Sequence, residues 1–353
     1  MRLCIASQYL SGGSGGIARV ARLTAKVAHQ QGYTVAALAA ADTQPVDDLP
    51  VPVRVFGQQR LRFVLACQRE ALSTGHFIYD FPGTGRAHVP IPILARPYAV
   101  WVCGIEIWEG MRPDYRRVIE GAHTIFSISN YSKARAEALH GCFARAQVCW
   151  LSTYEDVAAE VRRDRQSGPP TALIIARIAE DRYKGHEPLI AAWPAVVSKI
   201  SDARLVIAGG GVRLGEVRAA AAASPAAANI DVLGFVPEAD LETLWQRASV
   251  FAMPSLGEGF GLVYVEAMRH GLPVIGSIHD AAPEVNLDGV TGYNVDIGRP
   301  DDLVDRLIAL LGDPGHAAAI GQRGLQRWRE NFSYSGFQSR FAPLLNGFTG
   351  GNS

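Results

Sequence analysis

The sequence predicts an α/β protein built from two doubly wound domains, each around a parallel β-sheet. Short apolar runs alternate with longer helical patterns along the chain, which is the pattern of parallel α/β construction. A polar stretch with prolines and arginines, residues 156–170, interrupts this alternation and is typical of a linker. A chain of 353 residues is also long enough for about two domains. We therefore assign residues 1–155 to an N-terminal domain and residues 171–333 to a C-terminal domain.

The expected strands form two series, one on each side of the linker. The first series is residues 3–6, 34–38, 51–56, 77–80, 99–102, 124–127 and 148–151. The second series is residues 172–176, 204–208, 230–233, 250–253, 273–275 and 292–295. Open α/β sheets bind ligands beside the carboxyl ends of their strands. We therefore expect these ends of the two domains to face each other across a central cleft.

Composition and charge limit the classes of function. Hydrophobic residues make up 48% of the chain, and the formal net charge is zero, so the basic excess of a nucleic-acid binder is missing. The five cysteines show no C-x-x-C spacing, which indicates neither a disulfide framework nor a zinc site. Residues 1–7 read directly as a first strand, too short for a signal peptide or a membrane span. We expect a cytoplasmic protein, either freely soluble or peripheral at the inner face of the membrane.

The most informative segment is a glycine-rich loop, residues 257–262, that leads into an apolar helix. Glu258 lies between glycines in this loop, and Glu266 follows after seven intervening residues. We expect Glu266 in the first turn of the helix, so that both carboxylates face the cleft. An ionised carboxylate can accept two hydrogen bonds from a vicinal diol, which favours a polyhydroxylated ligand. The alternative is that Glu258 is a solvated acid and that Glu266 only offsets the helix N-terminus.

This segment resembles the E-x7-E signature of the retaining glycosyltransferases of the GT-B fold, in particular family 4, and the resemblance extends over nearly the whole chain. The resemblance implies that Glu266 binds the ribose hydroxyls of a sugar nucleotide and that Glu258 lies against the transferred sugar. The rest of the loop is then part of the donor site: Gly259, Phe260, Gly261 and Leu262. The resemblance also implies two Rossmann-like domains, with a last helix, within residues 334–353, that returns to the first domain.

Two cations are expected beside these acids. Arg177 follows the first strand of the second domain, and Lys184 precedes a glycine that opens a helix. The resemblance implies that both stabilise the charge that develops on the diphosphate leaving group, so that neither a metal ion nor a cofactor is needed. A solvated polar loop is the alternative. Gly209 and Val236 follow the next two strands and also match the family, with Val236 in the base pocket.

The first domain begins with a loop that admits two interpretations. As a glycosyltransferase, the chain would place Gly15 and Gly16 near the donor phosphate and sugar, and Arg19 on the acceptor side. Residues 13–18 also satisfy G-x-G-x-x-A, and Asp42 lies where a dinucleotide fold places its ribose acid. An NAD-dependent oxidoreductase is therefore the second hypothesis. It gives no reason for the acid pair and the cations in the other domain.

The chain departs from the family at two places. Cys103 stands where many relatives carry a histidine that contacts the donor sugar, and Glu106 and Trp108 complete this acceptor-side segment. A thiol is a weak donor and a poor acceptor compared with imidazole. Asp280 and Ala281 replace a pair of glycines, so their Cβ atoms should restrict how closely the backbone approaches the phosphates. These departures motivate a third hypothesis, a catalytically silent protein that binds a sugar or nucleotide.

The resemblance as a whole implies a retaining hexosyltransferase. Such an enzyme would move a hexose from a UDP- or GDP-sugar to a glycan or lipid-linked acceptor in polysaccharide or glycoconjugate biosynthesis. Residues 60–65 and 109–117 are locally basic with apolar neighbours. Either segment could meet a lipid-linked acceptor at a membrane surface, and a solvated helix face is the alternative for both.

Overall fold

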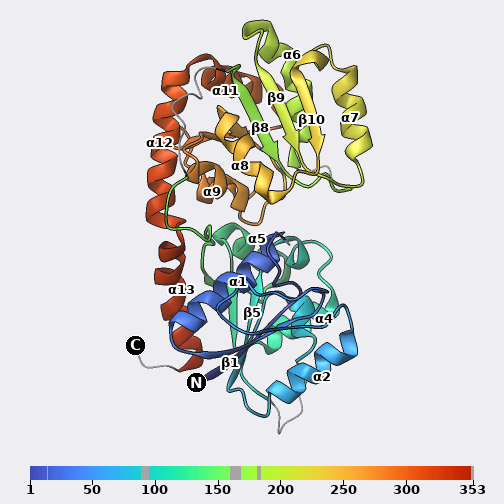
Figure 1. Ribbon diagram of the computed structural model, residues 1–353, viewed down its shortest axis with the longest axis vertical. Helices are drawn as coiled ribbons and strands as arrows, with labels where there is room; N and C mark the ends of the chain where they lie inside the picture. The colour runs from blue at the N-terminus through green and yellow to red at the C-terminus, as the bar shows by residue number, and fades with distance from the viewer. Residues whose placement is uncertain (14, 89–94, 160–167, 181–183, 351–353) are drawn as a thin grey trace. The chain divides into compact units, whose positions relative to one another are not determined.

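The structure, a computed structural model, describes residues 1–13, 15–88, 95–159, 168–180 and 184–350. The chain divides into two compact units, each with one sheet and its own helices (Figure 1). The first unit comprises Met1–Tyr154 together with Tyr334–Ser353, and the second comprises Glu155–Ser333. Part of the expected linker, residues 160–167, lies outside the described residues.

The first unit contains a seven-stranded parallel sheet in the order β3-β2-β1-β4-β5-β6-β7. Its strands are β1 Arg2–Ser7, β2 Thr34–Ala39, β3 Val53–Val55, β4 His76–Tyr79, β5 Tyr98–Val102, β6 Thr124–Ser127 and β7 Gln147–Val148. The strand order reverses between β1 and β4. Their carboxyl ends therefore form the topological switch point, where ligands bind in open α/β sheets.

The helices of the first unit connect these strands, and the last one arrives from the far end of the chain. They are α1 Gly15–Gln30, α2 Arg60–Glu70, α3 Pro82–Gly85, η1 Ile105–Ile107, α4 Pro113–Gly121, α5 Asn130–His140 and α13 Tyr334–Thr349. Phe341 of α13 is fully buried, with its ring centroid 5.3 Å from those of both Trp101 and Phe126. This aromatic contact explains why the C-terminal helix belongs to the first unit, since burying such rings stabilises the fold.

The second unit contains a six-stranded parallel sheet in the order β10-β9-β8-β11-β12-β13. Its strands are β8 Thr171–Ile175, β9 Arg204–Ala208, β10 Ile230–Gly234, β11 Val250–Ala252, β12 Val274–Ser277 and β13 Gly292–Val295. Its helices are α6 His186–Lys199, α7 Leu214–Ala223, η4 Ala227–Asn229, α8 Glu238–Arg247, α9 Leu262–Arg269, α10 Ala282–Val285, α11 Pro300–Gly312 and α12 Pro314–Asn331. Here the switch point lies between β8 and β11.

The predicted fold class is confirmed, and each expected strand corresponds to a strand of the structure. The differences lie at strand ends and are largest at the edges of the first sheet. The expected strand 51–56 is shortened to Val53–Val55, and the expected strand 148–151 is displaced to Gln147–Val148. Each of these edge strands pairs with a single neighbour. Short edge strands leave few unpaired backbone groups, and apolar content alone does not reveal where pairing stops.

Candidate functional site

Glu258 and Lys184 meet at the carboxyl edge of the second sheet. Glu258 lies in the loop between β11 and α9, and Lys184 lies just before α6. Lys184 Nζ and Glu258 Oε1 form an ion pair, with the two side chains 18% and 13% exposed. The structure thus joins two residues that the sequence analysis placed in one site, and it leaves both partly accessible.

A glycine allows these two loops to touch. Gly185 has a φ of +90°, and a Cβ atom there would lie 2.6 Å from the carbonyl oxygen of Pro254. Both the left-handed backbone and the lack of space require glycine at this position. The loop that carries Lys184 is consequently pressed against the loop that carries Glu258.

Asp280 holds the same loop from the side of β12. Its carboxyl group accepts hydrogen bonds from the backbone N–H of Glu258 at 3.0 Å and of Ala282 at 2.9 Å. The N–H of Ala281 donates to the carbonyl oxygen of Glu258 at 3.1 Å. Asp280 is 2% exposed, and burial raises its pKa to about 7. The residue that replaces a family glycine therefore acts on the Glu258 backbone, a role that the sequence analysis missed.

Glu266 lies one turn deeper in its helix than expected. The prediction that it sits in the first turn of α9 is wrong, because the helix begins at Leu262 and its first turn holds no acid. Gly261, with φ +86°, sets this start, and a Cβ there would lie 2.3 Å from the ring of Tyr264. Glu266 is half-buried, and its backbone carbonyl accepts from His270 Nδ1 at 2.8 Å.

The remaining loop residues differ in how far a ligand can reach them. The ring of Phe260 is 2% exposed and lies 5.9 Å from that of Phe332, so its side chain belongs to the core. Gly259 and Leu262 are half-buried. Because its ring is buried, Phe260 can contribute to a site here only through its backbone.

The loops after β8, β9 and β10 also lie at this edge. Gly209 has a φ of +146°, and a Cβ there would lie 1.9 Å from the carbonyl oxygen of Ala176, so glycine is required. Arg177 is exposed and forms no ion pair within the described part of the chain. Val236 is half-buried, whereas its neighbour Phe235, which the sequence analysis did not select, is 78% exposed.

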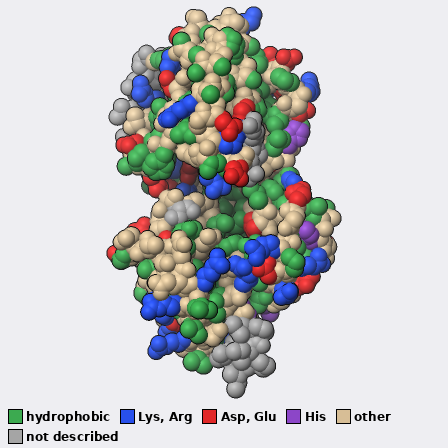
Figure 2. Space-filling model, turned by 90° about the vertical axis from the view of Figure 1, so that its right-hand side faces the viewer, with side chains coloured by type: hydrophobic (Ala, Val, Ile, Leu, Met, Phe, Trp, Pro, Cys, Tyr) green, Lys and Arg blue, Asp and Glu red, His purple; other side chains and the backbone are tan. Residues whose placement is uncertain are grey.

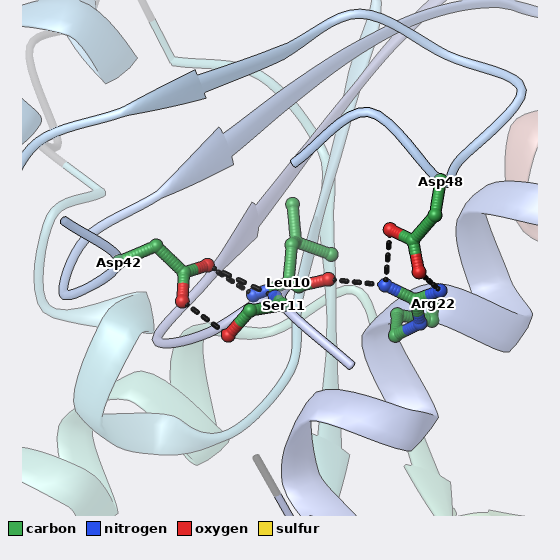
Figure 3. Close-up of polar contacts among 5 residues, drawn as sticks. All are labelled: Leu10, Ser11, Arg22, Asp42 and Asp48. Atoms are coloured by element: carbon green, nitrogen blue, oxygen red, sulfur yellow. Dashed lines mark hydrogen bonds and ion pairs between the residues drawn. The ribbon is translucent and has the colours of Figure 1, made fainter. Parts of the chain in front are cut away.

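In the first unit, the glycine-rich loop after β1 is fixed from two sides, as Figure 3 shows. Asp42 accepts from the N–H of Leu10 at 2.6 Å, and from the N–H and Oγ of Ser11 at 3.1 and 2.6 Å. On the other side, Arg22 donates to the carbonyl oxygen of Leu10 at 2.6 Å and forms two hydrogen bonds with Asp48 at 3.1 and 2.7 Å. The two charged groups therefore hold the loop that precedes α1.

These contacts bear on both interpretations of the loop. Asp42 uses three of its roughly four acceptor sites within the protein, which leaves little of its carboxylate for a ribose and weighs against the oxidoreductase hypothesis. Gly15 and Gly16 open α1 and are exposed, and no atom lies within 4 Å of a Cβ built on Gly15. Residue 14, inside the G-x-G-x-x-A pattern, lies outside the described residues. Arg19 stacks over the ring of Tyr154 at 4.6 Å.

The segment after β5 is a compact turn. The N–H of Cys103 donates to the Glu106 carboxylate, and Cys103 Sγ lies 3.9 Å from the carbonyl oxygen of Asp80. Burial raises the pKa of the Cys103 thiol well above its usual value and also raises the pKa of Glu106. A thiol held protonated is a poor nucleophile. Trp108 is 4% exposed, under the guanidinium of Arg135 at 4.5 Å, so it is a core residue.

Asp80 marks the switch point of the first sheet and was missed as a site residue. It directly follows β4, and its carboxyl group accepts from Ser7 Oγ at 2.7 Å, Gln8 N at 2.8 Å and Thr84 Oγ1 at 2.6 Å. It is 1% exposed, and burial raises its pKa to about 6. Its position at the end of an expected strand was the one available signal. Its bonds join β1, β4 and α3.

No group of three or more histidine, cysteine, aspartate or glutamate side chains is placed so as to hold a metal ion. None of the described helices combines the length and apolar character needed to cross a membrane.

Comparisons with known proteins identify what the chain resembles. Residues 159–327 match the family model described as glycosyl transferases group 1. A GDP-mannose-dependent α-(1-6)-phosphatidylinositol monomannoside mannosyltransferase of Mycolicibacterium smegmatis is 30% identical over 251 residues, which cover 67% of this chain and 65% of that protein. The match thus spans less than two thirds of this relative. These comparisons give no support to the oxidoreductase hypothesis.

Solved structures with the same fold are also known. HepE of Anabaena, solved with UDP and glucose, has a TM-score of 0.82 at 19% identity, covering 98% of this chain and all of that one. Sucrose-phosphate synthase of Thermosynechococcus elongatus has a TM-score of 0.80 at 16% identity, covering 99% and 100%. At such identities, these likenesses establish the fold of the two units.

The contacts of Asp42 lead to a prediction about stability. Asp42→Ala leaves the buried N–H of Leu10 without its acceptor, so we expect the free energy of unfolding to fall by about 1–3 kcal/mol. Thermal or denaturant unfolding measures this change. Asp47→Ala is the matched control, because Asp47 is exposed and forms no ion pair among the described residues. Equal stability of the two variants would show that Asp42 does not hold the loop.

Proposed function

We propose that the chain is a group 1 glycosyltransferase that transfers a hexose from a nucleotide diphosphate sugar to a glycan or lipid-linked acceptor, because residues 159–327 match that family model and the chain has the GT-B fold. The pairing of Lys184 with Glu258 is the observation that carries this proposal. A cation and a carboxylate, held together at the carboxyl edge of the sheet, suit a ligand that combines a diphosphate with sugar hydroxyls. The mannosyltransferase relative is named for GDP-mannose, which is therefore the first donor to test.

The proposed roles follow the charge that develops in the reaction. Lys184 and Arg177 stabilise the diphosphate as the glycosidic bond breaks, since preorganised cations act most strongly on charge that appears in the transition state. Glu258 contacts the transferred sugar, and Glu266 binds the ribose diol. The reaction proceeds at the front face with retention: a donor phosphate oxygen accepts the proton of the incoming hydroxyl, and the protein supplies alignment.

A second part of the proposal concerns the acceptor and the membrane. Leu61 and Leu65 are one turn apart on α2 and are 81% and 62% exposed, and Leu72, just beyond the helix, is 70% exposed. Arg62 and Arg69 are exposed beside them and form no ion pair among the described residues. Apolar side chains flanked by arginines suit the interface of an anionic membrane.

A hollow of about 660 Å³ next to α2 strengthens this proposal. It is lined by Arg62, Arg69 and Leu65, and by Arg54, which is paired with Glu70 at 3.1 Å, among others. It therefore places two arginines of α2 beside an exposed leucine. Figure 2 views the protein from the side where Figure 1 places α2, and basic and hydrophobic side chains gather there on the first unit. We propose that this face contacts the membrane that holds a lipid-linked acceptor.

The other basic segment, residues 109–117, is a weaker candidate for that contact. Arg112 is paired with Asp114 at 2.9 Å, and Arg116 is paired with Glu120 at 2.7 Å. Acidic partners offset much of the attraction of these cations for an anionic surface. Arg62 and Arg69 of α2, for which the described part of the chain supplies no ion-pair partner, are therefore preferred.

Donor binding can be tested by ligand-induced stabilisation. We expect GDP or UDP, but not NAD, to raise the melting temperature, because a ligand that binds only the native state adds about 2.7 kcal/mol at one hundred times its Kd. Glu266→Ala should abolish the shift, and Glu238→Ala, an exposed acid on α8, should retain it. A shift with NAD alone would contradict the proposal.

Turnover tests the chemistry. With GDP-mannose and other UDP- or GDP-sugars, we expect a product with retained anomeric configuration, assigned by NMR. Lys184→Ala should lower kcat about 100- to 1000-fold, since this is the usual effect of removing one group that stabilises transition-state charge. Lys199→Ala, an exposed lysine at the end of α6, is the control. An inverted product would exclude the retaining mechanism, and no turnover with any donor would support the silent binding protein.

Membrane contact can be measured by flotation with vesicles. The protein should bind vesicles of phosphatidylcholine with phosphatidylglycerol more tightly than phosphatidylcholine alone. Replacing Arg62 and Arg69 together with glutamine should weaken binding about 30-fold, at about 1 kcal/mol per basic residue near the surface. Leu61→Ser with Leu65→Ser should also weaken it, and Leu139→Ser, a partly exposed leucine on α5, should not. Equal binding to both vesicles would contradict this contact.

A further inference from the structure

We propose that Asp280 is a positioning residue, which orients Glu258 through its backbone and makes turnover depend on the ionisation of Asp280 itself. This inference rests on the proposed function, in which Glu258 contacts the transferred sugar. Asp280 does not touch the ligand in this proposal, because its carboxyl group is buried.

The geometry gives Asp280 direct control over the peptide of Glu258. Asp280 Oδ2 accepts from the N–H of Glu258, and the next residue, Ala281, donates to the carbonyl oxygen of Glu258. Both ends of this residue's backbone are thus bonded to one short segment. The side chain of Glu258 is held separately, by Lys184. A change at Asp280 therefore moves the backbone from which the Glu258 carboxylate extends.

A second hydrogen bond of Asp280 fixes its own segment, residues 280–282, which holds the Glu258 backbone. Asp280 Oδ1 accepts from the N–H of Ala282, the first residue of α10. The hydroxyl of Ser255, in the Glu258 loop, favours the ionised form of this carboxyl group and so lowers its pKa. With both oxygens engaged, the ionised carboxylate links β12, α10 and the loop after β11. A protonated carboxyl group turns one of these oxygens into a hydroxyl, which weakens one backbone bond.

Among the described residues, few charged or titratable groups face Asp280. Glu258 repels its ionised form, and Glu258 is itself paired with Lys184. Tyr264 of α9 also faces it and stays protonated, because burial raises its pKa well above the usual value. The ring of the neighbouring His279 is bonded to Asp296 at 2.8 Å. Burial is the main cause that brings the pKa of Asp280 to about 7.

The main test compares pH profiles of kcat/KM for the whole protein and for Asp280→Asn. Wild type should gain activity as the pH rises through about 7. The asparagine variant offers a single oxygen for two backbone donors, so we expect about tenfold lower kcat/KM at pH 8, no step near pH 7, and near equality at pH 5.5. His279→Gln is the control for the adjacent titratable group and should keep the wild-type step.

A second variant changes the ionisation without removing the carboxyl group. The hydroxyl of Ser255 lowers the pKa of Asp280, so Ser255→Ala should shift the midpoint of the step to higher pH. A step that persists in Asp280→Asn, or a midpoint that Ser255→Ala leaves in place, would overturn the inference while the proposed function stands.

A readout without substrate separates the two proposals. The folded pKa of Asp280 is raised, so its proton is retained in the native state and lost in the unfolded state between about pH 4 and pH 7. Stability linked to this group is therefore lost as the pH rises through that window. The melting temperature of Asp280→Asn minus that of wild type should increase from pH 5 to pH 8. A constant difference would contradict the assigned ionisation, whether or not the protein turns over a sugar nucleotide.

Discussion

Close packing of the loops at the carboxyl edge of the second sheet is the constraint on which the candidate donor site depends. The loop of Lys184 can lie against the loop of Glu258 only because Gly185 has no Cβ to meet Pro254. Taking the two charges out of water costs free energy that their attraction offsets only when the geometry is good. The ion pair therefore depends on the backbone contact, and the packing of the glycine determines whether the pair can form.

Buried aspartates that follow strands support the loops of both units in the same way. Asp42 and Asp80 in the first unit, and Asp280 in the second, each accept hydrogen bonds from backbone N–H groups of a neighbouring loop. Loops at the ends of parallel strands lack the ladder partners that satisfy the backbone within a sheet. A carboxylate supplies those partners, and burying it without them would be costly. The loops at the carboxyl edges of the two sheets are thus fixed largely by buried acids.

This arrangement explains which features the sequence could predict. Alternating apolar runs identified the two sheets. The resemblance to family 4 suggested that Glu258, Glu266, Arg177 and Lys184 share a site, and the structure joins two of them, Lys184 and Glu258. The hydrogen bond between Asp280 and Glu258 could not be predicted. Glu258 lies 22 residues away and donates through its backbone N–H, and a backbone contact has no sequence signature. The first turn of α9 was misplaced for a similar reason, since a steric contact of Gly261 sets where the helix begins.

Within one motif, the exposure of each residue decides whether a ligand can reach it. Trp108 and Phe260 belong to motifs that resemble binding segments, yet their side chains are 4% and 2% exposed and contribute to the core. Gly15 and Gly16, by contrast, present their backbone at the start of α1. A motif residue can therefore serve a site in two ways, by packing beneath a loop or by leaving its backbone uncovered. In these loops Trp108 and Phe260 do the first, and Gly15 and Gly16 do the second. Exposed backbone amides and the charged side chains beside them are therefore the groups that these loops leave open to a ligand.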